Sequence, residues 1–224
     1  MFTNTQPPPE VLRYDDGRRR LLLRRSQLCD LPQLADGVLD SLPELRQFMP
    51  WAHMAGSSCL EAQTQRCQTL IQLWDVGRDF AFNLFVRQAD GSLRFAGCLG
   101  LHPRCLANHG LEIGYWVRSD CTGQGLCTLA VKMAVLAGFQ AMGLKRIQVG
   151  CDVANEGSRR VIEKVGFISE GIQRNMGEVD PPFDAVERGW RGIGNTASYA
   201  LIPTDLERLD WPDSVARHLH FESL

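Results

Sequence analysis

The sequence contains no long apolar run and no pattern of a secretory signal. Among its 224 residues, no stretch approaches the roughly 18 uninterrupted apolar residues that a membrane-spanning helix needs. The first residues, MFTNTQPPPE, contain neither the basic segment nor the apolar segment of a signal peptide. Both absences argue against a membrane protein and predict a cytoplasmic one.

An excess of positive charge is also absent. The formal net charge is −2 and the calculated isoelectric point is about 6.2. A protein that binds nucleic acid or an anionic membrane through its overall charge is usually strongly basic. We therefore expect no direct nucleic-acid binding and no membrane contact.

The sequence shows no metal-binding spacing. None of its 8 cysteines forms a C-x-x-C pair, and its 5 histidines are scattered along the chain. Most of the cysteines fall inside predicted helices or strands, where cysteine behaves as a small apolar residue. We expect free thiols and no bound metal.

The chain length suits one domain of ordinary size rather than two. Residues 1–17 are polar and contain three consecutive prolines, which predicts a flexible tail. We expect a single domain over residues 18–205 and a tail or short helix over residues 206–224. Within the domain, residues 175–195 contain two adjacent prolines and four glycines without a sustained period, so they predict a long inserted loop.

Apolar periodicity predicts a mixture of strands and helices. In the first half we expect a strand at 18–25, two short helical pieces at 28–40 and 42–48 divided by Pro43, a longer helix from Ser57 to about Asp75, and a hairpin that turns at Ala89-Asp90-Gly91. In the second half we expect strands at 111–117, 145–151 and 167–173, helices at 123–142 and 155–165, and a last strand at ASYALIP.

The strand from Leu111 to Val117 leads into a glycine loop and then a helix. In Thr122-Gly-Gln-Gly-Leu-Cys127 the two glycines lack the Cβ atoms that would obstruct a ligand. The first N–H groups of the following helix have no intrahelical partner, and the positive end of the helix dipole lies behind them. This arrangement is typical of an anion site, although an ordinary strand-to-helix turn has the same pattern. The loop lacks the third glycine of a dinucleotide fingerprint and the Gly-Lys-Ser/Thr of a P-loop.

Several ordered motifs, EIGYWVRSDCTGQGLCTLAV followed by GLKRIQVGCDVANEGSRRVIEKVGF, resemble the acetyl-CoA core of the GNAT superfamily of N-acetyltransferases. The resemblance is strongest to the RimJ/RimL-like branch, which has a Glu-Ile-Gly-Tyr-Trp strand, a Gly-x-Gly loop, an Asn-x-x-Ser helix start and a Gly-Phe pair in this order. The chain departs from the superfamily loop at Thr122, where a long polar residue is usual, and at Cys127, where glycine or alanine is usual.

The resemblance implies an α/β fold with a mixed, mostly antiparallel sheet of six or seven strands, a splayed fourth strand and flanking helices. It also implies acetyl-CoA as acyl donor, with the pantetheine arm on the strand and the pyrophosphate on the loop. The residues implied in cofactor binding are Tyr115, Trp116, Val117, Thr122, Gly123, Gln124, Gly125, Leu126, Cys127, Asn155 and Ser158.

Three residues are candidates for catalysis. Glu112 lies on the strand that would border the site, where it could accept the amine proton through one water or serve only as a structural partner. Ser158 could give a proton to the coenzyme A thiolate, and Asn155 caps the helix and by resemblance contacts the cofactor arm or acceptor. Glu170 and Glu178 are weaker candidates for the base. Cys151 could be misread as a nucleophile, but direct attack by the amine makes a covalent step unnecessary.

The identity of the acceptor is open at this stage. The resemblance favours a protein N-terminal α-amino group, with ribosomal proteins as namesake substrates. A small amine such as a polyamine, amino acid or aminoglycoside, a different acyl donor, a non-catalytic acyl-CoA sensor and a homodimer also remain open. Trp51 could form a wall of the acceptor site or belong to the core. The fold that the resemblance implies would place the 175–195 loop near the edge of the site where acceptors enter. Its residues Glu178, Asp180, Asp184 and Glu187 beside Phe183 and Trp190 suit a cationic amine with an apolar neighbour, and a solvated surface excursion or an oligomer contact stays open as well.

Overall fold

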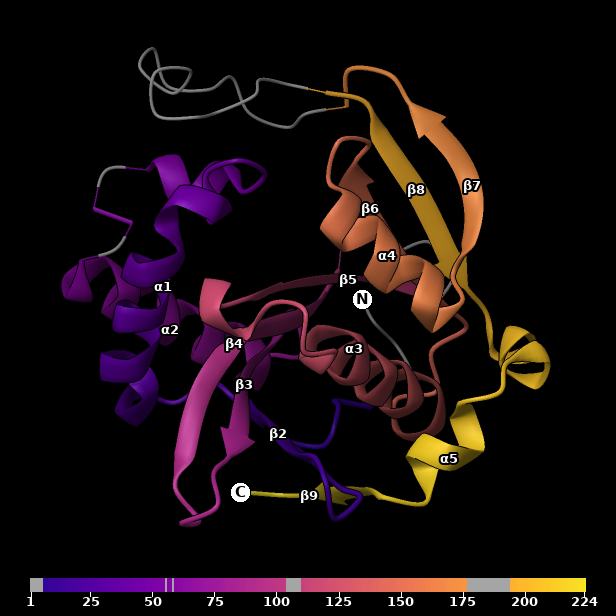
Figure 1. Ribbon diagram of the computed structural model, residues 1–224, viewed down its shortest axis with the longest axis horizontal. Coiled ribbons are helices and arrows are strands. Elements are labelled where there is room, and N and C mark those ends of the chain that lie inside the picture. The colour runs from indigo at the N-terminus through magenta and orange to yellow at the C-terminus, as the bar shows by residue number, and fades with distance from the viewer. Residues whose placement is uncertain (1–5, 55, 58, 104–109, 177–193) are drawn as a thin grey trace.

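The described residues form one nine-stranded sheet with helices on both faces (Figure 1). The computed structural model describes residues 6–54, 56–57, 59–103, 110–176 and 194–224. The strand order is β7-β8-β6-β5-β4-β3-β2-β1-β9, and every neighbouring pair is antiparallel except β5–β6. The predicted fold class, a mixed and mostly antiparallel sheet flanked by helices, is confirmed.

The elements have the following bounds. The strands are β1 Val11–Asp15, β2 Arg20–Arg25, β3 Phe80–Arg87, β4 Leu93–His102, β5 Gly110–Val117, β6 Arg146–Asp152, β7 Ile168–Gln173, β8 Thr196–Leu201 and β9 Leu219–Glu222. The α-helices are α1 Leu31–Leu45, α2 Leu60–Asp75, α3 Leu126–Leu136, α4 Glu156–Val165 and α5 Pro212–Ala216.

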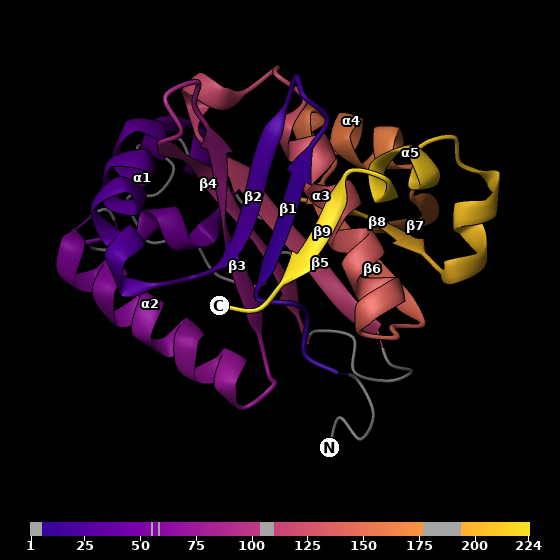
Figure 2. The same cartoon turned by 90° about the horizontal axis from the view of Figure 1, so that it is seen from below.

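The helices divide between the two faces of the sheet. Helices α1 and α2 pack on β4 and β3, whereas α3, α4 and α5 lie on the opposite face (Figures 1 and 2). Helix α3 is apolar on nearly all sides, because the sheet covers one side of it and α4 and α5 cover another. Side chains of β5 alternate accordingly: Leu111, Ile113 and Tyr115 belong to the α3-side core, and Trp116 packs with the α1-side cluster.

Both ends of the chain differ from the sequence prediction. Residues 11–15, expected in a flexible tail, form β1, and Leu12 is completely buried. Residues 206–224, predicted as a tail or short helix, contain the short helix α5 and, unexpectedly, the strand β9, which pairs antiparallel with β1. These two strands raise the sheet from the predicted six or seven strands to nine. Both strands are short. β1 also forms a hairpin with β2, whereas its pairing with β9 joins residues about 200 positions apart, so a local pattern could not reveal that second pairing.

Two helices also differ in their bounds. Helix α1 continues through Pro43 as one element, because Pro43 lies in its last turn, where a missing N–H costs one hydrogen bond without breaking earlier turns. The helix predicted over 123–142 begins at Leu126, ends as an α-helix at Leu136 and continues as a π-helical turn over Ala137–Ala141.

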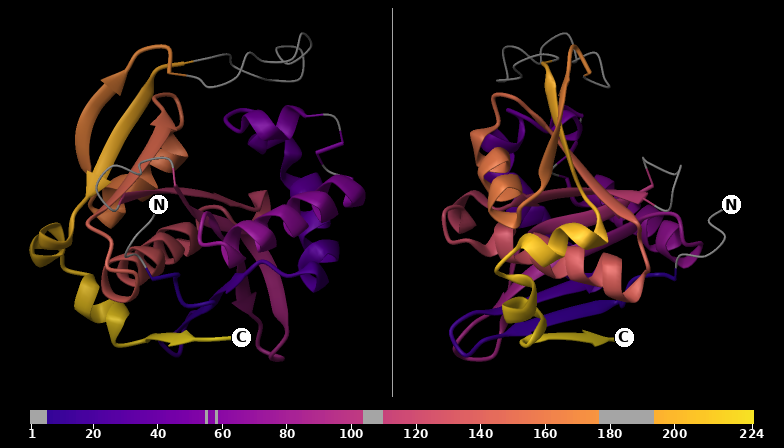
Figure 3. Two further views of the ribbon diagram at one scale, coloured as in Figure 1. Left: turned by 180° about the vertical axis from the view of Figure 1, so that it is seen from behind. Right: turned by 90° about the vertical axis from the view of Figure 1, so that its right-hand side faces the viewer.

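The sheet opens between β5 and β6. These strands pair over only three residues each, Gly110 to Glu112 with Arg146 to Gln148. Beyond that point β5 continues to pair with β4, and β6 pairs with β8. Figure 3 shows β7 and β8 turned away from the part of the sheet made by β1–β5. The splay predicted for this strand, the fourth in the sequence prediction, is therefore present.

Candidate active site

The open side of β5 is the first component of the site. From Ile113 to Val117 no strand pairs with the side of β5 that faces away from β4, in the part of the chain that the structure describes. Backbone N–H and C=O groups on an unpaired strand edge are available to a ligand with its own donors and acceptors. An extended molecule carrying amide groups would fit this edge.

The start of α4 lies across the opening. Asn155 caps this helix, since its Oδ1 accepts a hydrogen bond from the Ser158 N–H at 3.0 Å. The hydroxyl of Tyr115 lies 3.0 Å from Oγ of Ser158, so a β5 side chain is linked to α4 across the splay. Burial raises the pKa of Tyr115 well above its usual value, and the phenol therefore keeps its proton at neutral pH.

The glycine loop continues from the end of β5 to α3. Gly123 and Gly125 have φ angles of 73° and 74°, and no atom lies within 4 Å of where either Cβ would be. Gly125 is the N-cap of α3 and offers no side chain to the helix start. Within the described chain, the backbone N–H groups of residues 123–128 donate to no protein acceptor. A row of unpaired N–H groups at a helix start suits an anion such as a pyrophosphate.

Side chains of the loop stabilise the loop itself. Thr122 Oγ1 donates to the Ser119 carbonyl at 2.8 Å, and Gln124 Nε2 donates to the Asp120 carbonyl at 2.9 Å. Leu126 is buried, and burial raises the pKa of the half-buried Cys127 to about 12. Gln124, Leu126 and Cys127 can therefore offer a ligand their backbone N–H groups. The N–H of Thr122 donates to the Ser119 carbonyl at 3.3 Å, so this residue supports the loop and offers a ligand neither its N–H nor its hydroxyl proton.

Trp116 and Val117 lie on opposite faces of β5. The Trp116 ring is 6.2 Å from that of Trp51 and 5.8 Å from that of Phe95, so it belongs to the α1-side cluster. Val117 packs against the α3-side core. Their backbone lies on the open edge of β5, whereas their side chains contact other parts of the protein. Trp51 thus packs against Trp116. The Arg66 guanidinium lies over the Trp51 ring, with 5.2 Å between the guanidinium carbon and the ring centroid.

The carboxylates named from the sequence have different surroundings. Glu112 lies where β5 and β6 are still paired, and its Oε2 accepts a hydrogen bond from Gln148 Nε2 at 3.2 Å. Glu170 forms an ion pair with Arg146, with Nη1 to Oε1 at 2.7 Å, and this arginine lowers the pKa of Glu170. Glu178 and the other acidic residues of the predicted insertion lie outside the described residues.

Burial raises the pKa of Cys151, which disfavours the thiolate that a nucleophile requires.

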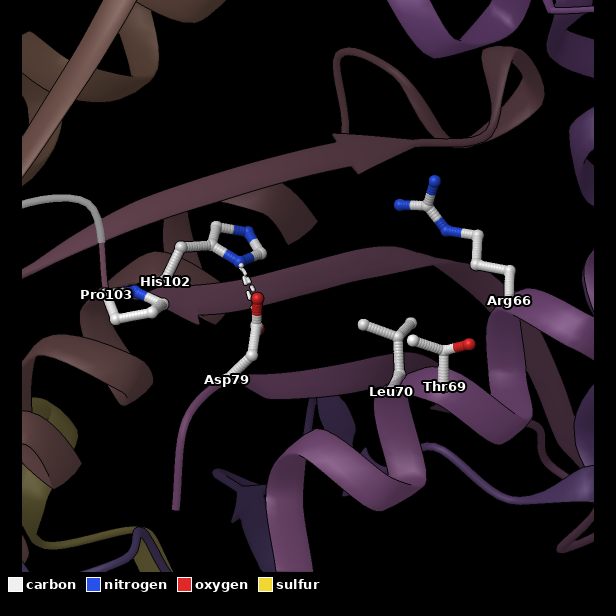
Figure 4. Close-up of a pocket in the computed structure, with 6 residues that line it drawn as sticks. All are labelled: Arg66, Thr69, Leu70, Asp79, His102 and Pro103. Carbon is white, nitrogen blue, oxygen red and sulfur yellow. Dashed lines mark hydrogen bonds and ion pairs between the residues drawn. The ribbon is translucent and has the colours of Figure 1, made fainter. Parts of the chain in front are cut away.

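A histidine–aspartate pair was missed from the sequence. Nδ1 of His102, the last residue of β4, lies 3.0 Å from each carboxylate oxygen of Asp79 (Figure 4). The two residues line a pocket together with Arg66, Thr69, Leu70 and Pro103. The signal was the position of His102 directly opposite Glu112 in the β4–β5 register, which depends on a strand pairing and not on sequence spacing.

The described residues contain no cluster of three or more His, Cys, Asp or Glu side chains that could hold a metal ion. Among the same residues, no helix combines the length and apolarity that crossing a membrane requires.

Comparison with known proteins adds independent findings. The profile of the family described as Acetyltransferase (GNAT) domain matches residues 20–168. The Bacillus subtilis (strain 168) protein named ribosomal N-acetyltransferase YdaF is 37% identical over 151 residues, which cover 65% of this chain and 76% of the relative.

Two solved structures share the fold. RimJ of Mycobacterium smegmatis in complex with CoA-disulfide has a TM-score of 0.74 at 24% identity, covering 94% of this chain and 95% of its own. RimL, a ribosomal L7/L12 alpha-N-protein acetyltransferase in complex with coenzyme A, has a TM-score of 0.71 at 21% identity, covering 85% and 97%.

Proposed function

The chain belongs to the GNAT acetyltransferase family, and from this premise we propose that it transfers the acetyl group of acetyl-CoA to the N-terminal α-amino group of a ribosomal protein. The observation that carries the proposal is the continuous surface formed by the open edge of β5, the unpaired N–H groups of residues 123–128 and the start of α4. The ribosomal substrate is supported by the name of the B. subtilis relative.

The donor would lie along this surface. Backbone groups of Tyr115, Trp116 and Val117 would bind the amide-containing pantetheine arm as a neighbouring strand does. The N–H groups of the loop would bind the pyrophosphate, with the positive end of α3 behind them. Acetyl-CoA supplies an activated thioester, so the chain has only to hold it and manage protons.

The departing thiolate needs a proton. Ser158 and Tyr115 share a hydrogen bond at the opening between β5 and α4, and the buried phenol stays protonated. Ser158 can therefore give its proton to the thiolate and recover one from Tyr115. Asn155 contributes by fixing the first turn of α4 through its bond to the Ser158 N–H.

The acceptor amine must lose a proton before it attacks. At pH 7 this costs an α-amino group about 1 kcal/mol and a lysine side chain roughly 4.6 kcal/mol, because their usual pKa values are about 7.7 and 10.4. An N-terminal substrate therefore needs only a weak base. Glu112 stays a candidate for it, through a bridging water, although its carboxylate also accepts from Gln148.

The charge of the described pocket supports a peptide acceptor over a polyamine. Arg66 lines it, packs over Trp51, and has no carboxylate partner in the described chain. The fixed Arg66 cation would repel a polyamine, which carries several positive charges, more strongly than a peptide N-terminus, which has one charge and becomes neutral before reaction. A small-molecule amine is the second candidate, because loop residues outside the described part could add negative charge.

The test is amine-dependent release of coenzyme A. The chain is incubated with acetyl-CoA and a panel of peptides with free N-termini, matched peptides with blocked N-termini, spermidine and an aminoglycoside, and products are identified by mass spectrometry. We expect acetylation of the free N-termini alone. Faster acetylation of spermidine would favour the second candidate, and acetyl-CoA binding without any amine-dependent release would indicate a sensor. The cytoplasmic location, a homodimer and the absence of nucleic-acid binding stay predictions.

A further inference from the structure

We propose that His102, oriented by Asp79, is the general base that accepts the proton of the acceptor amine, and that the pocket between α2 and the end of β4 receives the acceptor. The inference rests on the proposed function, since it names the base and the acceptor position of the same reaction. It assigns this step to a side chain other than Glu112.

The imidazole lies over the sheet at the place where the splay begins. A β-carbon at Gly100 would be 2.6 Å from Nε2 of His102, and one at Gly114 would be 3.2 Å away. Both distances are too short for a real Cβ atom to be accommodated without movement, so glycine at both positions makes room for the ring. Gly114 lies on β5 just beyond the last residue paired with β6. Nε2 therefore lies beside the stretch of β5 proposed to hold the donor.

Asp79 determines which nitrogen of the ring can accept a proton. Both of its carboxylate oxygens lie 3.0 Å from Nδ1, so this nitrogen carries the hydrogen and donates it to the carboxylate. Nε2 is then the acceptor of the neutral ring, and the nearby negative charge stabilises the imidazolium that forms when it takes a proton. Asp79 is a positioning residue in this scheme, because it acts through His102.

Glu112, the other candidate for the base, already accepts a hydrogen bond from the protein, whereas Nε2 of His102 does not within the described chain. Glu112 is held by Gln148 of β6, on the closed side of the splay. Nε2 of His102 has no hydrogen-bond partner within the described chain, and 27% of the side chain remains accessible. An acceptor can therefore reach the histidine without first displacing a hydrogen bond from any described residue.

The pocket provides an approach to that nitrogen. Figure 4 shows Arg66 of α2 and the His102–Asp79 pair on opposite sides of it, with Thr69 and Leu70 between them along α2. Among the described residues, the charged or titratable groups around His102 are Asp79 from the turn before β3, Arg66 from α2 and Glu112 from β5. A peptide N-terminus can enter with its ammonium toward His102, because the Arg66 cation repels it from the other side.

The proton balance needs no further reagent. The ammonium gives one proton to Nε2, and the neutral nitrogen attacks the thioester carbonyl. The new C–N bond forms, the C–S bond breaks, and the thiolate gains a proton from Ser158. Of the two protons still on the attacking nitrogen, one stays in the amide, and the other leaves through solvent and restores the proton that the Ser158–Tyr115 pair has given up. The products are the N-acetyl amide and coenzyme A thiol, and the imidazolium releases one proton to solvent.

The experiment compares kcat and KM of His102→Asn with those of the wild-type chain, using acetyl-CoA and an N-terminal peptide across a range of pH. We expect kcat to fall by about 100-fold or more, the scale of general base catalysis. The rise in melting temperature caused by acetyl-CoA should be unchanged, because the donor surface is intact. The acid side of the pH–kcat/KM profile should lose the limb that reports protonation of the base. His220→Asn on β9, at the far edge of the sheet, is the matched control and should retain wild-type rates.

A second variant keeps the test decisive if His102→Asn does not fold. Asp79→Asn retains the imidazole, and we expect kcat to fall about tenfold with an unchanged acceptor KM and partial recovery in Asp79→Glu. Two results would overturn this inference and leave the proposed function standing, provided that the wild-type chain is active. One is a kcat of His102→Asn within threefold of the wild-type value, and the other is an unaltered kcat in Asp79→Asn. Absence of amine-dependent turnover in the wild-type chain would overturn the proposed function and the inference with it.

Discussion

On the proposed donor side of β5 a ligand would meet backbone groups, namely the open edge from Ile113 to Val117 and the N–H groups of residues 123–128. On the α1–α2 side it meets side chains, those of Arg66, Asp79 and His102, which come from three separate segments. A backbone site depends on chain path and free volume and tolerates changes of side chain. A side-chain site depends on the identity of each residue and tolerates changes around it. The predictions below test this difference.

The largest effect is expected for Gly125→Glu. A side chain at φ 74° is strained, and its carboxylate would lie where the pyrophosphate is proposed to bind. Acetyl-CoA should no longer raise the melting temperature, as measured by differential scanning fluorimetry. Gly91→Glu is the matched control, because Gly91 also has a positive φ, 86°, and open space at Cβ, but lies in the β3–β4 turn. An unchanged acetyl-CoA shift in folded Gly125→Glu would remove the loop from the donor site.

A smaller effect is expected for Tyr115→Phe, which removes the hydroxyl beside Ser158. We expect kcat to fall about 10- to 100-fold, while the KM for acetyl-CoA stays near its wild-type value, since the backbone of β5 is unaltered. Because burial raises the pKa of Tyr115, the wild-type phenol is protonated throughout the neutral and mildly basic range. The loss should therefore have the same size at every pH in that range.

Tyr14→Phe controls for the loss of a hydroxyl, since Tyr14 donates to Asp16 at 3.0 Å, away from the splay. A loss in Tyr115→Phe that appears only in the KM for acetyl-CoA would show that the tyrosine binds the donor and does not supply protons.

A still smaller effect is expected for Glu112→Gln. The substitution keeps the shape of the side chain and, after rotation of the amide, a partner for Gln148, so β5 and β6 remain paired. We expect kcat within about threefold of wild type at each pH, as measured by thiol release. A tenfold loss that grows toward low pH would instead identify Glu112 as the base and place the proton chemistry on the closed side of the splay.

The smallest effect is expected for Thr122→Ala on the affinity for acetyl-CoA. The Thr122 hydroxyl bonds to the Ser119 carbonyl within the loop, and the proposed contacts with the donor are made by N–H groups. We expect a dissociation constant within about threefold of wild type by isothermal titration calorimetry, together with a small loss of thermal stability. A tenfold weaker affinity would show that the donor side also relies on side chains.

The sequence named more residues of the proposed donor side than of the proposed acceptor side. Residues 111–117, the glycine loop and Asn155 to Ser158 are close together in the chain, so the order of their motifs could be read directly. The residues His102 and Asp79 carry no motif, and only the strand register and the turn before β3 bring them together. The histidines were interpreted as scattered for this reason. The spacing of residues along the sequence can indicate a site whose residues lie close together in the chain. It does not indicate a site whose residues come from separate segments.

The same reason explains the errors in the fold. Both β4 and β5 were recognised because they are apolar and close in sequence. Strands β1 and β9 are only 5 and 4 residues long and pair with each other from the two ends of the chain. The division of α1 at Pro43 was predicted from a local rule, whereas the helix continues because the proline falls in its last turn.

The pairing of β1 with β9 has a consequence for how the chain is made. Residues 11–14 leave the ribosome before their partners in β9, which are synthesised about 200 residues later, a delay on the order of ten seconds or more at typical elongation rates. During that interval β1 can join β2 but must present an unpaired edge, which is a template for unwanted pairing between nascent chains. Arg13 lies on this edge and ends up paired with Glu222 of β9 through two hydrogen bonds, 2.8 and 3.0 Å long. The Arg13 charge thus discourages association between nascent chains before β9 has been made. Once β9 has been made, the same charge is part of the contact that joins β9 to β1.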